Sequence, residues 1–177
     1  MSLAVHEAFQ HCPGCGALAE GFTSRKRFLC PHCEFCFYFN PACAVAAIIL
    51  NESSEALFIR RKRMPAQNRL SLPGGFVDPG ERLEDALVRE TKEEVNLDIT
   101  HYEFLCSAPN QYVYRGVSYA VTDSFFTARV ESFIPLRPQD SEVGGIQFLP
   151  LRPATFEQLA FPSLAHALNL FQEQRGC

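Results

Sequence analysis

Apolar residues are grouped along the chain in short runs that predict β-strands. The run Val45–Leu50 is continuous, which is typical of a buried strand, and a second run at Ala56–Arg60 follows a polar turn at Asn51–Glu55. A basic, proline-containing loop is expected at Lys62–Arg69. Later segments rich in aromatic and β-branched residues predict four more strands, at Glu103–Ala108, Gln111–Tyr114, Tyr119–Val130 and Ile146–Leu149.

Helices are expected in three of the remaining segments. Arg82–Val95 has the pattern of a helix, and Thr155–Leu159 suits a short one. Ser163 is expected to cap a last helix that runs through Gln174, because a serine hydroxyl can accept a hydrogen bond from a free N–H of the first turn. Strands interleaved with helices indicate an α/β or α+β domain, and we favour α+β.

Composition and charge exclude several classes of protein. The 177 residues are 47% hydrophobic and 20% charged, which is ordinary for a globular chain and excludes disorder and fibres. The longest apolar run, Ala42–Leu50, is far shorter than the roughly 20 residues that a membrane span needs. The net charge of −4 argues against wholesale nucleic-acid binding. Residues 1–10 lack the pattern of a secretory signal, so a cytoplasmic location is expected.

The cysteine pattern predicts a zinc site near the N-terminus. The eight cysteines are Cys12, Cys15, Cys30, Cys33, Cys36, Cys43, Cys106 and Cys177. The pairs Cys12/Cys15 and Cys30/Cys33 have zinc-ligand spacing, because each short turn aims two sulfurs at one point. The segment resembles a zinc ribbon, and a site filled by four thiolates is expected to be structural. We place the ribbon at residues 1–40 and a second domain at residues 41–177.

Other interpretations of the cysteine-rich segment stay open. Two disulfides are disfavoured because nothing signals export, and His32 is an alternative ligand. Cys36 and Cys43 are either further alternative ligands or small buried residues. Glu34 stands where the first turn has Gly16, so the second turn is expected to be less regular than the first.

A carboxylate-rich helix carries the strongest signal for chemistry. At about 100° per residue, Glu90, Glu93 and Glu94 fall within an arc of about 100° and share one helix face. Another face, which can pack inward, carries Val88, Thr91 and Val95. Like charges three and four residues apart repel, so a fold that keeps them is expected to hold a cation. Carboxylate oxygens suit hard ions such as Mg²⁺ or Mn²⁺.

Residues 74–97 resemble the Nudix box, G-x5-E-x7-R-E-U-x-E-E-x-G-U, where U is a bulky apolar residue. Gly75 and Leu97 take its first and last positions. All charged positions of the box are filled, by Glu81, Arg89, Glu90, Glu93 and Glu94. Thr91 replaces an apolar residue but is still β-branched, and Asn96 replaces a glycine that is expected to end the helix with positive φ.

The resemblance covers about Ala44–Leu170 and implies an α/β/α sandwich with a mixed β-sheet that hydrolyses a nucleoside diphosphate linked to another group. The implied ligands of Mg²⁺ or Mn²⁺ are Glu90, Glu93, Glu94 and the backbone carbonyl of Gly75. Glu81 and Arg89 are expected to fix the helix and its carboxylates. Glu142 resembles the general base that this family carries in a late loop; a solvated loop residue, with Glu90 or Glu94 as the base, is the alternative.

A zinc ribbon followed by a Nudix box is similar to the NADH pyrophosphatase group, although residues 107–114 lack the tryptophan and two of the prolines of that group. The resemblance therefore implies ADP-ribose or a related ADP-linked compound as the first substrate, with release of AMP. NAD(H), FAD and NAD-capped RNA are alternatives, and a nucleotide-sensing binding module is the non-enzymatic one. Candidate substrate contacts are Arg60, Tyr112 and Phe125. A homodimer is an open expectation, RNA is not favoured, and no membrane partner is expected.

Overall fold

The computed structural model describes residues 2–19 and 24–176, which form two compact units. One unit contains Met1–Ala42 and Gln111–Val121, and the other contains Cys43–Asn110 and Thr122–Cys177. Residues 111–121 therefore cluster with the N-terminal residues and not with their neighbours in sequence. Within the described residues, no helix is both long enough and apolar enough to cross a membrane.

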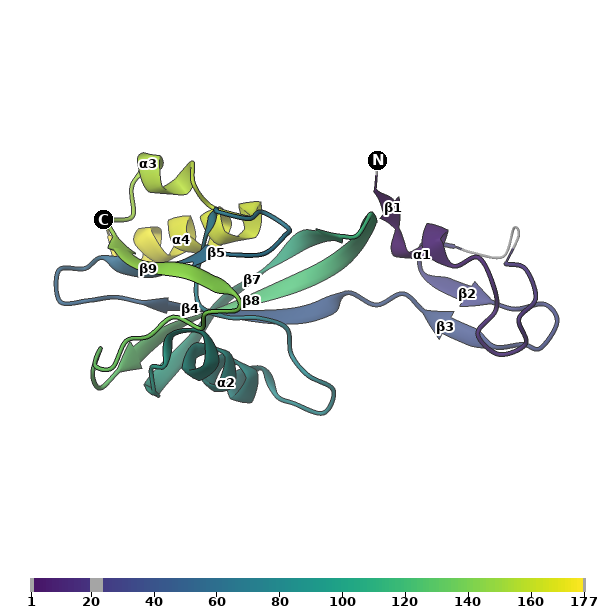
Figure 1. Cartoon of the computed structure of the whole chain (residues 1–177), viewed down its shortest axis with the longest axis horizontal. Helices are drawn as coiled ribbons and strands as arrows, with labels where there is room; N and C mark the ends of the chain where they lie inside the picture. The colour runs from purple at the N-terminus through teal and green to yellow at the C-terminus, as the bar shows by residue number, and fades with distance from the viewer. Residues whose placement is uncertain (1, 20–23, 177) are drawn as a thin grey trace. The chain divides into compact units, whose positions relative to one another are not determined.

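The N-terminal part of the first unit contains a short hairpin and a small core. Its elements are β1 (Leu3–Ala4), α1 (Val5–Ala8), β2 (Arg27–Leu29) and β3 (Cys36–Tyr38) (Figure 1). The antiparallel strands β2 and β3 place Phe28 opposite Phe37. Phe28 is buried with Cys12 and Cys30, so the core of this unit adjoins its cysteines. With so few buried side chains among its described residues, this part of the chain has little hydrophobic stabilisation of its own.

The remaining strands form two sheets. They are β4 (Ala42–Ile49), β5 (Ala56–Arg61), β6 (Leu70–Ser71), β7 (Ile99–Tyr114), β8 (Val117–Val130) and β9 (Val143–Leu149). In one sheet β8 pairs with β4 and β7, and its Val117 end runs parallel to β1. In the other sheet β5 lies between β6 and β9, and both pairs are antiparallel.

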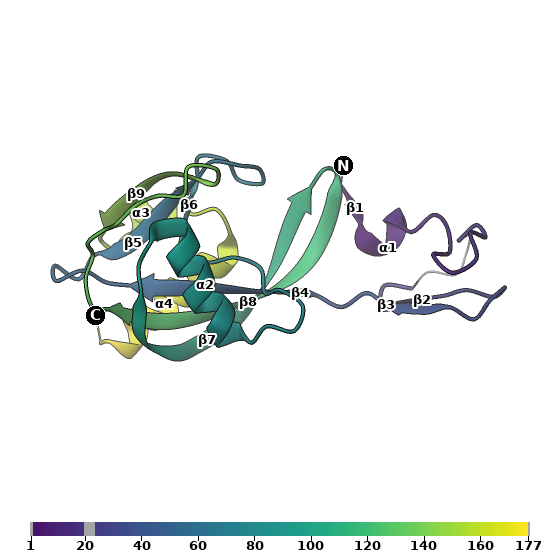
Figure 2. The same ribbon diagram turned by 60° about the horizontal axis from the view of Figure 1, so that its bottom comes forward.

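Helices cover both sides of the second unit. The helix α2 (Leu83–Val95) lies on one side, and α3 (Pro153–Phe156) and α4 (Pro162–Gln174) lie on the other (Figures 1 and 2). The expected sandwich of helices around mixed strands is therefore confirmed.

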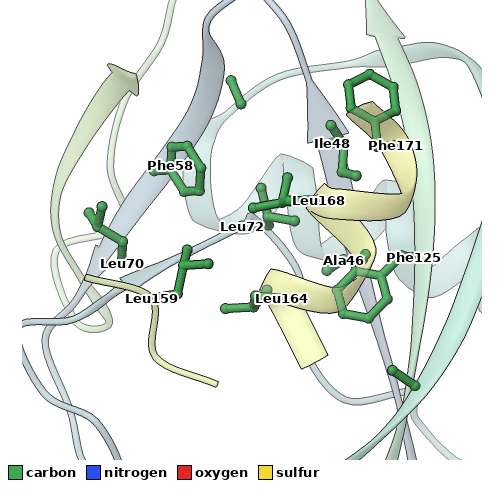
Figure 3. Close-up of a cluster of buried hydrophobic side chains, with 13 residues drawn as sticks. Ala46, Ile48, Phe58, Leu70, Leu72, Phe125, Leu159, Leu164, Leu168 and Phe171 are labelled. Carbon is green, nitrogen blue, oxygen red and sulfur yellow. The ribbon is translucent and has the colours of Figure 1, made fainter. Parts of the chain in front are cut away.

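Strand β4 connects the two cores of this unit. Ile48 belongs to the cluster that contains Leu168 of α4, which Figure 3 shows, and Ile49 belongs to the cluster that contains Leu87 of α2. Successive residues of a strand point to opposite faces, so a strand that is buried on both faces is apolar throughout. This explains the continuous apolar run at Val45–Leu50.

Three local predictions differ from the structure. The strands expected at 103–108 and 111–114 are one strand, β7, because β7 pairs only with β8 among the described strands and an edge strand tolerates Pro109. The short helix expected at 155–159 begins and ends earlier, as α3. Val88 is 38% exposed and does not pack inward.

The expected N-cap of the last helix is also wrong. The cap position is Phe161, and Pro162 occupies the first turn, where its fixed φ suits a helix start. The hydroxyl of Ser163 instead donates a hydrogen bond to Oδ2 of Asp123 at 2.6 Å. The serine therefore joins α4 to β8.

Candidate functional site

A glycine loop lies against β4 immediately before α2. The N–H of Val45 donates to the Gly75 carbonyl at 2.9 Å, and the N–H of Ala47 donates to the Pro73 carbonyl at 2.8 Å. A Cβ on Gly74 would lie 2.1 Å from the carbonyl oxygen of Val45, and φ at this residue is +147°, so only glycine fits. These contacts hold the loop and leave the Gly74 N–H available to α2.

Glu94 is a deeply buried carboxylate of α2. It is 7% exposed, and its Oε2 accepts a hydrogen bond from the Gly74 N–H at 2.8 Å. Burial raises the pKa of Glu94 to about 8, and the negative charges of Glu90 and Glu142 act in the same direction. A bound cation would relieve this unfavourable environment for the carboxylate charge.

Glu90 lies where the second loop glycine makes room for it. A Cβ on Gly75 would lie 2.6 Å from the Glu90 carboxylate. Burial also raises the pKa of Glu90. The Gly75 carbonyl accepts a hydrogen bond from Val45 and still has a second lone pair, so it is able to bind an ion as well.

Arg89 joins the acidic residues around α2. Its Nε and Nη2 each donate to Glu81 at 2.8 Å, and its Nη1 donates to Glu90 at 2.7 Å. Nη2 also donates to the carbonyl of Phe76 at 3.1 Å. The bidentate hydrogen bonds from Arg89 lower the pKa of Glu81 to about 2. Arg89 therefore forms ion pairs with both Glu81 and Glu90, and these contacts tie the loop before α2 to the helix.

Glu93 is more exposed than the other two glutamates of the expected helix face. Its side chain is 50% exposed, and its Oε2 lies 3.5 Å from Nη1 of Arg89. Within the described residues, no three carboxylates are gathered as closely as the cysteine thiols described below. The structure thus brings Glu90 and Glu94 to the glycine loop, while Glu93 stays at the surface of α2.

Glu142 is brought to this site from a distant part of the sequence. The N–H of Gln139, in the turn that precedes β9, donates to the carbonyl of Glu94 at 2.9 Å. The charge of Glu142 raises the pKa of both Glu90 and Glu94, so the three carboxylates lie within electrostatic range of one another.

The three expected substrate contacts have different surroundings. Nη1 of Arg60 donates to the carbonyl of Asn68 at 2.6 Å. Tyr112 is half-buried in the segment of β7 that belongs to the first unit. Phe125 is completely buried in the core between the sheet and α4. The expectation that Phe125 contacts the substrate is wrong, because a ring that is completely buried has no face available to a ligand.

Two residues of this region were not singled out by the sequence. The motif gives no role to Gly74, although the Gly74–Gly75 pair is a signal for close backbone approach. Arg63 lies in the basic loop expected at Lys62–Arg69, which gave it no individual role. It donates to Glu142 at 2.7 Å, and the two residues are 79 positions apart, so no local pattern connects them.

The four cysteines converge as their spacing predicts. Their Sγ atoms all lie within 4.8 Å of one another, and the four residues, Cys12, Cys15, Cys30 and Cys33, are free thiols. Glu34 has φ +60° and Gly16 has φ +75°, so each turn has a residue in the left-handed conformation at the equivalent position. The second turn therefore follows the first in this respect, and the expectation that it is less regular is wrong. Cys36 and Cys43 are exposed and lie outside this group, so they are not the small buried residues that we considered.

The donors of both sites fit the metals that the motifs imply. Four convergent thiols suit Zn²⁺. The carboxylates of α2 and the Gly75 carbonyl are hard oxygen donors, which suit Mg²⁺ or Mn²⁺. The missing side chain of Gly75 leaves the room that the Glu90 carboxylate occupies beside the loop.

Comparisons with known proteins agree with this geometry. The family model described as NUDIX domain matches residues 40–170. An ADP-ribose pyrophosphatase from Methanocaldococcus jannaschii is 45% identical over 64 residues, which are 36% of this chain and 37% of that protein. The NAD-capped RNA hydrolase NudC of Photorhabdus laumondii is 29% identical over 104 residues, which are 59% of this chain and 40% of that protein. The chain thus spans about two fifths of the length of these relatives.

A solved structure supports the same fold over most of the chain. A NUDIX hydrolase from Nitrosomonas europaea has a TM-score of 0.66, with 22% sequence identity, and the match covers 94% of this chain and 93% of that one. At this level of identity the likeness concerns the fold alone.

Proposed function

Because the chain belongs to the Nudix family, we propose that it is a Mg²⁺-dependent pyrophosphohydrolase that cleaves a nucleoside diphosphate linked to another group. ADP-ribose or a related ADP-linked compound is the proposed substrate, and AMP is one product. The 45% identity to a protein named ADP-ribose pyrophosphatase supports this choice over a matched segment of 64 residues.

One observation carries the proposal, namely the pair of glutamates at the glycine loop. Glu94 is buried with its carboxylate on the Gly74 N–H, and Glu90 occupies the space beside Gly75. Two acidic groups held together in a partly dry site repel each other, which is unfavourable for the fold on its own. A bound divalent cation would offset this repulsion and would supply positive charge to the diphosphate of the substrate.

The roles of the remaining residues follow from their contacts. The proposed ligands of Mg²⁺, or of Mn²⁺ in its place, are Glu90, Glu93, Glu94 and the Gly75 carbonyl. When bound, the ion supplies positive charge for the oxygens of the diphosphate that become more negative during cleavage. Arg89 and Glu81 fix the loop and the helix, which keeps Glu90 in place.

Glu142 is the proposed general base, with Glu90 or Glu94 as the alternative. A water oxygen forms a bond to one phosphorus, and the bond from that phosphorus to the bridging oxygen breaks. The proton of the water passes to a carboxylate oxygen of Glu142, and the bridging oxygen leaves with the other phosphate. Arg60 and Tyr112 remain candidate contacts for the rest of the substrate.

In the first unit, we propose that Zn²⁺ bound by the four cysteines has a structural role. All four ligand positions of a tetrahedral site are then filled by the protein, so no position is left for a substrate. A homodimer and a cytoplasmic location stay predictions.

A second candidate function has support from a longer match. The similarity to the NAD-capped RNA hydrolase NudC extends over 59% of this chain. NAD(H), FAD and NAD-capped RNA are therefore alternative substrates of the same site, because each contains a nucleoside diphosphate linked to another group. A nucleotide-binding module without hydrolysis is the non-enzymatic alternative.

Product analysis by mass spectrometry tests these functions. The protein, loaded with zinc, is incubated with Mg²⁺ and a panel of ADP-ribose, NADH, NAD, FAD, dinucleoside polyphosphates, nucleotide sugars, nucleoside triphosphates and NAD-capped RNA. Release of AMP from ADP-ribose supports the first proposal, and preferential cleavage of NAD(H) or capped RNA supports the second. Binding without product from any compound would contradict both in favour of a sensor.

The variant Glu94→Gln tests the proposed metal site. Glutamine keeps the shape and an acceptor for the Gly74 N–H but removes the charge, so the fold is expected to stay intact while kcat falls at least about 100-fold, near 2.7 kcal/mol of barrier. Glu84→Gln, in the first turn of the same helix, is the matched control and is expected to stay active. A rate near wild type for Glu94→Gln would refute the metal assignment.

A further inference from the structure

Backbone hydrogen bonds fix the turn that carries Glu142. The N–H of Gln139 donates to the carbonyl of Glu94 at 2.9 Å, and the N–H of Glu142 donates to the carbonyl of Gln139 at 3.1 Å. From the other side, the N–H of Lys62 donates to the carbonyl of Glu142 at 2.8 Å. The backbone of the turn is therefore held between the end of α2 and the end of β5, whatever side chain stands at position 142.

The end of β5 is shaped to reach this turn. The register between β5 and β9 shifts between Arg60 and Arg61, which marks a bulge. A bulge bends its strand and redirects the residues that follow it. After the bulge, Nζ of Lys62 donates to the carbonyl of Asp140 at 2.5 Å, and Arg63 extends to the same turn. Two consecutive basic residues thus bind the turn: Lys62 contacts its backbone, and Arg63 contacts the side chain of Glu142.

Arg63 holds the side chain of Glu142 in an unfavourable electrostatic environment. Nη1 of Arg63 donates to Oε1 of Glu142 at 2.7 Å, and the two side chains are 61% and 48% exposed. Glu90 and Glu94 lie within electrostatic range of Glu142, and their ionised forms repel its carboxylate. Without Arg63, a half-exposed carboxylate is expected to rotate away from these like charges into solvent, although its backbone stays in place.

We propose that Arg63 is a positioning residue that holds Glu142 where it can accept the proton of the attacking water. The contact uses Oε1, and within the described residues no hydrogen bond engages Oε2, which is the oxygen left for the proton. An exposed ion pair contributes little to folding stability, so placement of the carboxylate explains this contact better than stability does. The inference rests on the proposed function and on Glu142 as its base.

Steady-state kinetics of Arg63→Ala and Arg63→Lys test the inference, with the substrate found by product analysis. Arg63→Ala is expected to lower kcat about tenfold, with KM changed less than about twofold and the melting temperature unchanged. Arg63→Lys is expected to restore part of kcat, because lysine keeps the cation but not the planar fork of arginine. Arg129→Ala, which removes an exposed arginine from β8, is the matched control and is expected to keep the wild-type kcat.

A double-mutant cycle separates this role from direct substrate binding. Glu142→Gln is expected to lower kcat at least about 100-fold, and adding Arg63→Ala to it is expected to have no further effect. A wild-type kcat for Arg63→Ala, a raised KM with unchanged kcat, or independent losses in the double variant would each overturn the inference.

A wild-type kcat for Glu142→Gln would also overturn the inference, although it leaves the proposed function intact. Failure of the proposed function is distinct, because the wild-type protein then releases no product at all, and the inference falls with it.

Discussion

Gly74 and Gly75 are neighbours with different surroundings, so alanine at each position is expected to cause a different defect. A Cβ at position 74 meets the backbone of Val45 at 2.1 Å, which cannot move away easily, so Gly74→Ala is expected to destabilise the fold by at least about 2 kcal/mol. A Cβ at position 75 meets the movable end of Glu90 at 2.6 Å. Gly75→Ala is therefore expected to lower kcat at least about tenfold with a smaller loss of stability.

Urea unfolding and steady-state kinetics on the two variants measure these effects. Gly145→Ala is the control, because a Cβ at this position of β9 has no neighbour within 4 Å and its stability is expected to stay near that of the wild type. The assignment of Glu90 to the site would be wrong if Gly75→Ala kept full activity.

Individual residues could be predicted from sequence where the deciding geometry is local. The resemblance to the Nudix box was enough to expect that Arg89 and Glu81 fix the helix and its carboxylates, because both lie in the helix or in the loop just before it. The pattern of β8 was not enough for Phe125, because the alternation of a strand separates two faces without telling which of them is fully covered. The contact between Arg63 and Glu142 depends on how β5 meets a distant turn, and nothing local encodes it.

Within α2, Thr91 leaves a buried hydroxyl without a partner. The residue is 0% exposed, and within the described residues its Oγ1 has no hydrogen-bond partner. An unpaired buried hydroxyl costs about 1–3 kcal/mol, and valine has nearly the same shape. Thr91→Val is therefore expected to raise the free energy of unfolding by about 1 kcal/mol without changing kcat, as measured by urea unfolding and kinetics. Thr91→Ser, which keeps the hydroxyl and loses a methyl, is expected to be less stable than the wild type, and a destabilised Thr91→Val would contradict this account.

The ends of elements were predictable where a single residue sets the backbone. Asn96 ends α2 with φ +56°, as its place in the motif predicted, because asparagine tolerates this conformation better than most residues. Glu34 adopts the same kind of conformation with no such preference, because the surrounding cysteine turn determines its backbone. The continuity of β7 through Pro109 depended on that strand being an edge, which is a property of the sheet and not of the segment.

At the scale of the whole chain, sequence order and compact units do not coincide. Residues 111–121 cluster with the N-terminal segment, where Leu3 pairs with Val117. Hydrophobic patterns predict that a strand exists but not which distant strand it joins, so the composition of this unit was not foreseeable. The cysteine cluster was foreseeable, because two close pairs with a fixed separation leave few arrangements for four sulfurs.

The separation into units predicts that loss of zinc affects stability more than chemistry. All proposed catalytic residues, from Gly75 to Glu94 and Glu142, belong to the second unit, which has two hydrophobic clusters of its own. Among the described residues, the part of the first unit around its cysteines has one small hydrophobic cluster, so its folding is expected to depend on the metal. Cys12→Ser is therefore expected to lose zinc, measured by elemental analysis, and to show an unfolding transition at lower temperature in calorimetry. Its kcat is expected to change less than about threefold, below 1 kcal/mol of barrier.

Cys36→Ser, which changes an exposed cysteine outside the cluster, is the control and is expected to keep its zinc. Unchanged melting of Cys12→Ser in the absence of zinc would refute a structural role for the metal, and a large loss of kcat at full stability would instead tie the cysteine cluster to the reaction.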